Sequence, residues 1–489
     1  MRPWMRASLL IAALAVSGQG HAQTPRSNPL GAAITAIVEG SRLTGARLGV
    51  VVMDATTGRV LYEHDPDVPL NPASNAKVLT AAVALSRLGP PRRFATGLYG
   101  SVTQGVTRGE VVLRGEGDPS LALRDLYEMA RELALSGVRE VRGDVVVDDS
   151  FLGAQHLPPA FEQQPDETAV FRSTVSAVSL DRNAMVVRVA AGPDVGAPAL
   201  VAVDPPGYAE VVNEVSTTDG GSPSLSVEVT PLADGRERVR VTGRHPLGAP
   251  VALRARRLEN PSLAAGYALR SMLAVAGVRV TGGVRVAPAA LAGRALLVRH
   301  ESAPLATLLQ RVGKESDNFY AEMTLLALAA QPSREEPAGE VTFERGAARM
   351  IDWARRAGVD TQGMVVRNGS GLFDANRFSA RQVASVLRAA WRDPAIRDEY
   401  VAQLAVAGDE GTLRSRGRAA GTSGPRRVRA KTGTLRDVIA LSGYALAPDP
   451  SRTLIFVVLC NGVAGHGAEA RAMADRIAAT VADALPRGP

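Results

Sequence analysis

The stretch PASNAKVLT, residues 72–80, places a hydroxyl and an amine one helical turn apart at the opening of an apolar helix. Side chains at positions i and i+3 share a helix face, so we expect Ser74 and Lys77 within hydrogen-bond reach. A serine hydroxyl is a weak nucleophile until a base takes its proton. Lysine acts as that base only when burial or a nearby cation lowers its pKa. Taken alone, the spacing also fits a helix start with a solvated lysine.

The scarcity of lysine favours the catalytic interpretation. Of the 56 basic residues only three are lysine, and the other 53 are arginine. Arginine stays charged and cannot act as a base, whereas a buried lysine can lose its proton. Each lysine is therefore expected at a position whose role arginine cannot fill. Each lies in or beside a short polar motif. Lys77 belongs to residues 72–80, Lys314 precedes SDN at 316–318, and Lys431 opens KTGT at 431–434.

These motifs together supply the groups that acyl transfer needs: a nucleophile, a base, an oxyanion hole and a proton route to the leaving group. Ser74 and Lys77 fit the first two roles. Ser316 can relay a proton, Asn318 can hold a substrate amide, and Lys431 can bind a terminal carboxylate. Singly, residues 316–318 also fit a helix cap and residues 431–433 a strand-edge turn. The three motifs occur together, and all three lysines lie in or beside them. This combination favours an enzyme.

The KTGT motif is also expected to bind substrate through its following residues, Thr432, Gly433 and Thr434. Because glycine lacks a side chain, Gly433 allows close approach along the strand. The backbone N–H groups of Ser74 and Thr434 could then form the oxyanion hole.

Other catalytic constellations are not supported by the sequence. The six histidines are scattered and none has a zinc-binding spacing, so we predict no metal and no cofactor. The absence of a G-x-S-x-G motif in a suitable triad order argues against an unrelated esterase.

An export signal is predicted over residues 1–22, with Arg2 and Arg6 before an apolar run at 7–16 and the small-residue site GHA at 20–22. The run is too short to span a bilayer. No later run reaches about 18 apolar residues, so we expect no membrane anchor after cleavage. We predict an exported protein in the periplasm or cell-wall space, with an uncleaved anchor as the alternative.

The composition of the 489 residues is that of a globular protein, with 46% hydrophobic and 21% charged residues. This length allows two to four domains. The net charge of +7 could suggest nucleic acid. The arginines are scattered, however, and the chain is predicted to be exported, so an anionic cell-wall polymer is favoured and no nucleic-acid partner is predicted. The single cysteine, Cys460, is interpreted as a buried structural thiol.

Hydrophobic periodicity and Gly/Pro punctuation predict helix and sheet at both ends of the chain around a long β-rich insert. Helices are expected over residues 30–40, 74–88, 121–136, 261–276, 318–330, 343–357, 379–390 and 467–485. Strands are expected over residues 48–53, 59–63, 143–147, 184–189, 199–203, 224–229, 236–241, 278–286, 428–432, 439–445 and 453–460.

The ordered trio of S-x-x-K, S-D-N and K-T-G is typical of penicillin-binding proteins and β-lactamases. Over most of residues 45–485 the chain resembles the class C low-molecular-mass penicillin-binding proteins, the D-alanyl-D-alanine carboxypeptidase/endopeptidases. Further shared motifs are GDP at 117–119, DRN at 181–183, NFYAE at 318–322, GSGL at 369–372 and AGDEGTL at 407–413.

The resemblance implies an α/β (α+β) fold in which a split serine transpeptidase/β-lactamase-like domain carries a two-part β-rich insertion. The implied division is a signal peptide (1–22), a catalytic domain (23–92 and 297–489), an inserted second domain (93–157 and 255–296) and an inserted third, β-rich domain (158–254).

The resemblance also implies a reaction on peptidoglycan. Ser74 would be acylated by the penultimate D-Ala of a stem peptide, releasing the terminal D-Ala, and water would clear the acyl-enzyme. An endopeptidase cleaves cross-links by the same steps, and β-lactam antibiotics would be covalent inhibitors. Lys77 would be the base, and Ser316 with Lys431 would assist proton transfer to the leaving amine.

Asp148 resembles the family acid that meets the free amine of the stem-peptide side chain, and Asp149 fits that place as well. No tryptophan occurs over residues 158–173, where relatives often carry one. A β-lactamase would have a shorter insert and a dedicated deacylating acid, and a non-catalytic peptidoglycan-binding protein would more naturally have lost a motif residue. The sequence makes no prediction of oligomeric state or of carboxypeptidase against endopeptidase preference.

Overall fold

The computed structural model describes residues 28–153, 155–164, 167–332, 339–417 and 427–486. The predicted export signal, residues 1–22, lies outside this part of the chain. Among the described residues, no helix combines the length and apolar character needed to cross a membrane.

A six-stranded sheet forms the base of the fold, in the order β18-β19-β20-β21-β1-β2, with every neighbouring pair antiparallel. Strands from the two ends of the chain meet in it, since Arg47 pairs with Asn461 and Asp54 with Leu454. The predicted hairpin is confirmed as β1 and β2. The bounds are β1 Arg47–Asp54, β2 Val60–His64, β18 Ala405–Val406, β19 Val428–Leu435, β20 Val438–Ala445 and β21 Leu454–Asn461.

Helices cover both faces of this sheet because successive side chains of a strand point to opposite faces. Val50 and Val52 of β1 pack with α1 and α10, whereas Val51 and Met53 pack into the cluster formed by the other helices. Cys460 is buried on the same side of the sheet as Val50 and Val52, in the cluster formed with α1 and α10. The bounds are α1 Pro29–Glu39, α2 Ala76–Leu88, α5 Leu305–Gly313, α6 Asn318–Ala330, α7 Phe343–Arg356, α8 Ala380–Arg392, α9 Arg397–Ala402 and α10 Gly467–Asp483.

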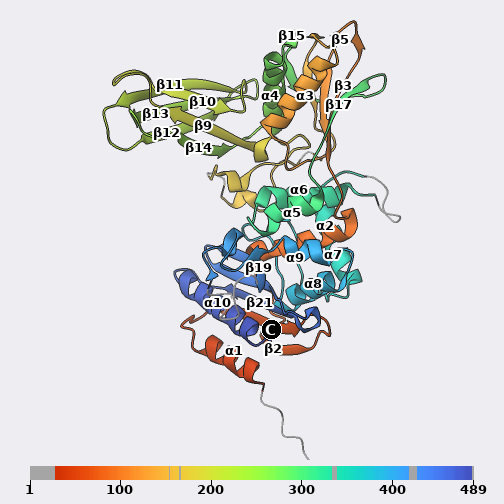
Figure 1. Cartoon of the computed structure of the whole chain (residues 1–489), viewed down its shortest axis with the longest axis vertical. Helices are drawn as coiled ribbons and strands as arrows, with labels where there is room; N and C mark the ends of the chain where they lie inside the picture. The colour runs from red at the N-terminus through yellow and green to blue at the C-terminus, as the bar shows by residue number, and fades with distance from the viewer. Residues whose placement is uncertain (1–27, 154, 165–166, 333–338, 418–426, 487–489) are drawn as a thin grey trace, which may run out of the picture.

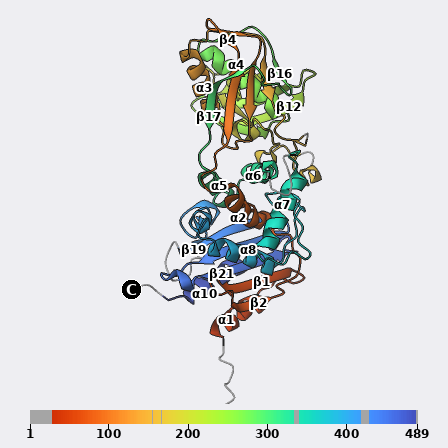
Figure 2. The same cartoon turned by 90° about the vertical axis from the view of Figure 1, so that its right-hand side faces the viewer.

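The long insert leaves after α2 and returns before α5 along two paired strands. β3 (Ala95–Gly100) leads out and β17 (Ala295–Glu301) leads back, and the two are antiparallel neighbours, with Glu301 opposite Ala95. Because exit and return lie side by side, the insert stands at one end of the molecule, opposite α1, with α5 and α6 between it and the central sheet (Figures 1 and 2).

The insert contains two β-rich parts (Figure 1). One holds the sheets β16-β8-β6-β3-β17 and β15-β7-β5-β4 with helices α3 and α4, and the other holds β10-β9-β14 and β11-β13-β12. The bounds are β4 Val102–Thr103, β5 Val106–Arg108, β6 Val111–Gly115, α3 Leu123–Leu135, β7 Glu140–Arg142, β8 Val145–Asp148, β9 Ala184–Ala190, β10 Leu200–Asp204, β11 Ala209–Thr218, β12 Ser224–Pro231, β13 Glu237–Pro246, β14 Ala252–Arg257, α4 Pro261–Val275, β15 Arg279–Val280 and β16 Val284–Val286.

Several elements, among them β3, β14, β17 and α5, lie outside the ranges expected from the sequence. Strand β11 was missed because half of its residues are exposed and its sequence does not alternate regularly between apolar and polar residues. The strand expected over 278–286 is two short strands, β15 and β16, joined by a turn. Ser74 lies in a 3-10 turn, Ala73–Asn75, immediately before α2 rather than within the α-helix. The division of the chain into domains at the stated boundaries stays a prediction.

Candidate active site

Ser74 lies at the entrance of α2, and it is the one residue of 70–85 that is not buried. The turn before it is tight: the Ala73 N–H donates to Asn71 Oδ1 at 2.9 Å, and Ala73 adopts a left-handed φ of 46°. A non-glycine residue in that region stores strain that the surrounding structure must hold in place. The turn therefore presents the Ser74 hydroxyl at the surface of an otherwise buried segment.

Lys77 is enclosed by three oxygen atoms. Its Nζ lies 3.0 Å from Ser74 Oγ, 2.8 Å from Asn318 Oδ1 and 2.7 Å from the Ser370 carbonyl oxygen. Burial lowers the pKa of Lys77 to about 7, while nearby carboxylates partly oppose that shift. A neutral amine can donate to Asn318 and Ser370 and accept the Ser74 proton. The one-turn spacing thus places a partly neutral amine beside the hydroxyl.

Glu322 is the source of the largest opposing charge. It is buried, and its two carboxylate oxygens accept the backbone N–H groups of Gly369 and Ser370, each at 2.9 Å. Burial raises its pKa, and Lys77 is among the groups that lower it. Glu322 therefore holds in place the loop whose Ser370 carbonyl contacts Lys77.

Lys431 and Ser316 form a second lysine–serine pair. The Lys431 Nζ donates to Ser316 Oγ at 2.8 Å and to the Thr432 carbonyl oxygen at 2.9 Å. Lys431 is only 1% exposed. Its pKa is lowered mainly by burial, with a further contribution from the positive charge of Lys77. Ser316 takes a left-handed φ of 61°, and the Thr432 hydroxyl donates to Thr412 Oγ1 at 2.8 Å.

Gly433 lies where β19 approaches the serine turn most closely. A Cβ on Gly433 would come to 3.0 Å from both the Pro72 carbonyl oxygen and Asn75 Nδ2. Only glycine allows that approach without displacing the turn. Ser74 and Thr434 consequently line one cleft.

That cleft has a volume of about 870 Å³. Ser74, Ser316, Asn318 and Thr434 all line it, so the structure brings the three motifs to one place. Phe171, from the insert, lines it too, and its carbonyl oxygen accepts the Asn318 side-chain amide at 3.0 Å. The insert therefore touches one of the predicted catalytic residues directly.

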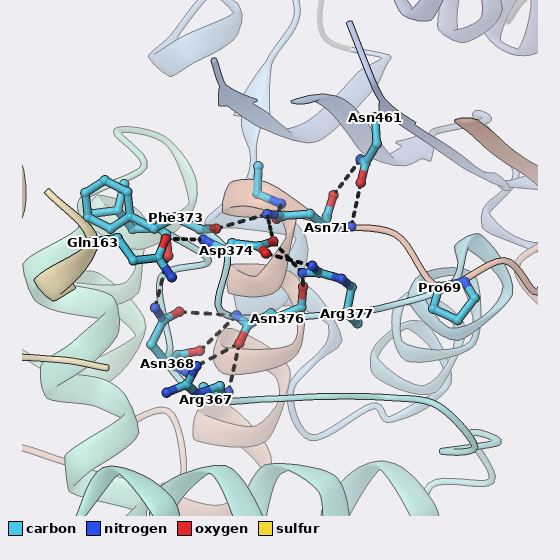
Figure 3. A network of polar contacts seen from close by, with 12 residues as sticks. Pro69, Asn71, Gln163, Arg367, Asn368, Phe373, Asp374, Asn376, Arg377 and Asn461 are labelled. Carbon is cyan, nitrogen blue, oxygen red and sulfur yellow. Dashed lines mark hydrogen bonds and ion pairs between the residues drawn. The ribbon is translucent and has the colours of Figure 1, made fainter. Parts of the chain in front are cut away.

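A polar network, drawn in Figure 3, includes Asn71, Phe373, Asp374 and Arg377, which form another wall of the cleft. Asn71 Nδ2 donates to the Phe373 carbonyl oxygen at 3.0 Å and to Asp374 Oδ1 at 3.2 Å. Arg377 pairs with Asp374 at 2.6 Å, and this contact holds the Asp374 pKa below its usual value. Gln163 of the insert accepts the Asp374 N–H at 3.2 Å. This wall was not among the residues predicted from the sequence.

Comparison with known proteins assigns the family. The model of the D-Ala-D-Ala carboxypeptidase 3 (S13) family matches residues 30–483. The chain belongs to this family. A D-alanyl-D-alanine carboxypeptidase of Actinomadura sp. (strain R39) is 36% identical over 474 residues, covering 93% of this chain and 85% of that protein. Carboxypeptidase DacB of Mycolicibacterium smegmatis is 30% identical over 467 residues, covering 94% of this chain and 85% of that protein.

A solved structure agrees with the fold. The crystal structure of penicillin binding protein 4 (dacB) from Haemophilus influenzae superimposes with a TM-score of 0.74 at 23% identity, over 92% of this chain and 98% of that one. The family match and the relatives confirm the predicted resemblance and the enzyme class, and the solved structure confirms the mixed α/β fold class.

In this S13 family member, Asp148 does not lie in the cleft. It ends β8 in the insert, is fully buried, pairs with Arg114 at 3.3 Å and accepts the Ser150 hydroxyl at 2.6 Å. The alternative, Asp149, is held by the Ala177 N–H at 2.5 Å and the Ser262 hydroxyl at 2.6 Å. Both carboxylates therefore bind partners within the insert, although their position in the chain had suggested a contact with substrate.

One residue near the cleft that was not predicted, Glu322, left a signal in the sequence. Glu322 is the single charged residue of the otherwise uncharged helix α6, which indicates a buried carboxylate with a specific partner. Phe171 left none, because its contact with Asn318 joins segments 147 residues apart.

Proposed function

We propose that this chain is an exported serine D-alanyl-D-alanine carboxypeptidase/endopeptidase that acts on peptidoglycan stem peptides and cross-links through an acyl-Ser74 intermediate. One observation carries the proposal: Ser74 Oγ lies 3.0 Å from the amine of a buried lysine whose pKa is lowered to about 7. A hydroxyl in contact with such an amine can be deprotonated at neutral pH.

Acylation begins when neutral Lys77 takes the Ser74 proton and Ser74 Oγ attacks the carbonyl carbon of the penultimate D-Ala. The backbone N–H groups of Ser74 and Thr434 stabilise the negative charge that develops on the carbonyl oxygen. The amide C–N bond then breaks, and Ser316 with Lys431 assists the transfer of the proton from Lys77 to the leaving amine, so Lys77 is neutral again. The ester on Ser74 is left behind.

Substrate binding uses the cations and amides around the serine. Asn318 binds a substrate amide, and Lys431 with Thr432 and Thr434 binds the terminal carboxylate. An incoming carboxylate raises the pKa of the buried Lys431 amine and so favours its charged form. Lys431 and the substrate carboxylate therefore form an ion pair once the substrate is bound.

Deacylation reverses the chemistry with water in place of the leaving amine. Water attacks the ester carbonyl, Lys77 accepts its proton, and Ser74 is regenerated with release of the shortened peptide. A β-lactam acylates Ser74 in the same way, but its leaving nitrogen stays tethered to the acyl group. We therefore expect inhibition by penicillins through a slowly hydrolysed ester.

The test is to incubate the mature protein with a fluorescent penicillin, map the covalent adduct by peptide mass and follow its lifetime. A long-lived adduct on Ser74 that is lost in Ser74→Ala supports the proposal, and release of D-Ala from a stem pentapeptide completes it. Rapid drug turnover indicates a β-lactamase instead. No adduct on folded protein indicates a peptidoglycan-binding protein without this chemistry.

A further inference from the structure

A second cavity lies next to the reactive cleft. It has a volume of about 990 Å³ and is bordered by the start of α6, the segment leading into α3, and strands β9 and β14 of the insert. Phe171, Ser316 and Asn318 line both this cavity and the cleft that holds Ser74. A ligand that passes these three residues can therefore occupy both spaces.

The lining of this cavity is polar and carries both charges. Three arginines of its lining pair with carboxylates of its lining: Arg182 with Asp317 at 3.0 Å, Arg188 with Asp204 at 2.9 Å and Arg311 with Glu315 at 2.7 Å. Each guanidinium has five N–H donors, and one carboxylate uses at most two of them. The three arginine side chains are 40–49% exposed, so donors remain for a ligand.

A fourth arginine, Arg124, and a fourth carboxylate, Asp181, also line the cavity. With four groups of each sign, the cavity favours neither a simple anion nor a simple cation. Its chemistry suits a peptide that carries both carboxylates and an amine. Stem peptides of peptidoglycan are of this class.

The position of Ser316 indicates which part of the substrate enters the cavity. In the proposed reaction the leaving amine receives its proton at Ser316, whose hydroxyl contacts Lys431 at 2.8 Å. Whatever is bonded to that nitrogen extends from Ser316. One D-alanine would occupy a small part of about 990 Å³, because cavities of roughly 300–1,000 Å³ hold drug-sized ligands.

We propose that this second cavity is the subsite for the leaving peptide of a cross-link, which adapts the site to endopeptidase cleavage. The proposal rests on the acyl-Ser74 mechanism. In the step that uses the cavity, the amide between D-Ala and the side-chain amine of a second stem peptide breaks. The Ser74 ester forms, the released amine keeps the proton delivered through Ser316, and the second peptide departs from the cavity.

The experiment fills the cavity without touching the reactive groups. Ala255, an exposed residue of β14, lines the cavity, and Ala255→Trp would occupy space in it. Ser226→Trp is the matched control, since it adds the same side chain at an exposed position of β12, whose sheet does not line the cavity. Three rates are compared: acylation by penicillin, D-Ala release from a monomeric pentapeptide, and cleavage of a cross-linked dimer.

We expect Ala255→Trp to lower kcat/KM for the dimer at least about tenfold while the other two rates stay within about twofold of the wild type. Ser226→Trp should change none of the three. Arg124→Ala, at a side chain that is 84% exposed, should weaken dimer cleavage in the same selective way and keeps the test valid if the tryptophan variant does not fold.

Two results overturn the subsite: equal loss of monomer and dimer cleavage, or unchanged dimer cleavage in both cavity variants. A wild type that is acylated and releases D-Ala but leaves the dimer intact overturns it as well. If penicillin does not acylate the wild type, the acyl-serine mechanism itself is refuted. That result is distinct from the three results that refute the subsite alone.

Discussion

At the scale of single residues, Lys77 is the proposed base for Ser74. Replacing it by methionine keeps the length of the side chain and removes the amine, so we expect Lys77→Met to slow acylation by about 10²–10⁴-fold, the usual range for a general base. Lys314→Met is the matched control, because Lys314 pairs with Glu410 at 2.9 Å instead of with a proposed reactive group. Penicillin acylation of folded variants measures both, and near-normal acylation of Lys77→Met would end the role of Lys77 as base.

The pH dependence of acylation follows from the same residue. Since the folded pKa of Lys77 is about 7, its neutral form grows as pH rises. We expect the acylation rate to rise with pH up to about 7 and then to level off. Glu322 raises the pKa of Lys77 by charge attraction, so Glu322→Gln should move the rising limb to lower pH.

Glu322→Gln should also reduce stability by about 1–3 kcal/mol, because an amide group can accept only one of the two N–H groups that the carboxylate accepts. Acylation rates measured across pH, together with denaturant unfolding, separate the two effects. A pH profile identical to that of the wild type would show that Glu322 carries no charge in the folded protein and would contradict the expected shift.

At the scale of elements, the loop with Gly371 packs on the turn that holds Ser74. Gly371 has a φ of 74°, and a Cβ there would overlap the Ala73 carbonyl oxygen. Gly358 has a similar φ of 81°, but a Cβ would meet nothing within 4 Å. We expect Gly358→Ala to cost about 1–2 kcal/mol from the left-handed backbone alone.

Gly371→Ala should cost more stability than Gly358→Ala and should also slow acylation, since the clash displaces the serine turn. Denaturant unfolding and penicillin acylation of the two variants give the comparison. Equal losses of stability with normal acylation in both would mean that the loop does not support the turn.

At the scale of the whole molecule, the insert contacts the segment 316–318 that lines the cleft. Arg182 reaches across to Asp317, between Ser316 and Asn318, and it lies in a run of three left-handed non-glycine residues. The buried Asn183 side chain holds that run by donating to the Thr174 carbonyl oxygen at 2.8 Å. A strained turn so held gives Arg182 a fixed direction.

We expect Arg182→Ala to slow acylation by about tenfold, equivalent to 1.4 kcal/mol, because the turn at Ser316 loses a support. Stability should change little, since the Arg182 side chain is 43% exposed and exposed ion pairs contribute about 0–1 kcal/mol. Arg238→Ala is the control, because it breaks a similarly exposed pair with Glu210 that is remote from the cleft. Partial rescue by Arg182→Lys is expected, and equal acylation by both alanine variants would refute the positioning role.

Much of the fold could be predicted because its signals are local. Helix α6 begins at Asn318, as expected, since Asp317 caps it, and the strands of the central sheet show as runs of apolar residues. Strand β11 was missed because its sequence carries no such local signal. Asp148 illustrates the limit: its place in the chain was readable, but its burial against Arg114 was not.

The pattern of residues 72–80 was enough to predict that Ser74 and Lys77 lie within hydrogen-bond reach, because residues three apart share a face wherever the chain turns helically. The pKa and the contacts of Lys77 were not predictable from that pattern. Its lowered pKa depends on burial by segments far along the chain, and its contacts with Asn318 and Ser370 span 241 and 293 residues. Burial and long-range contacts arise from packing of the whole chain, which no local pattern specifies.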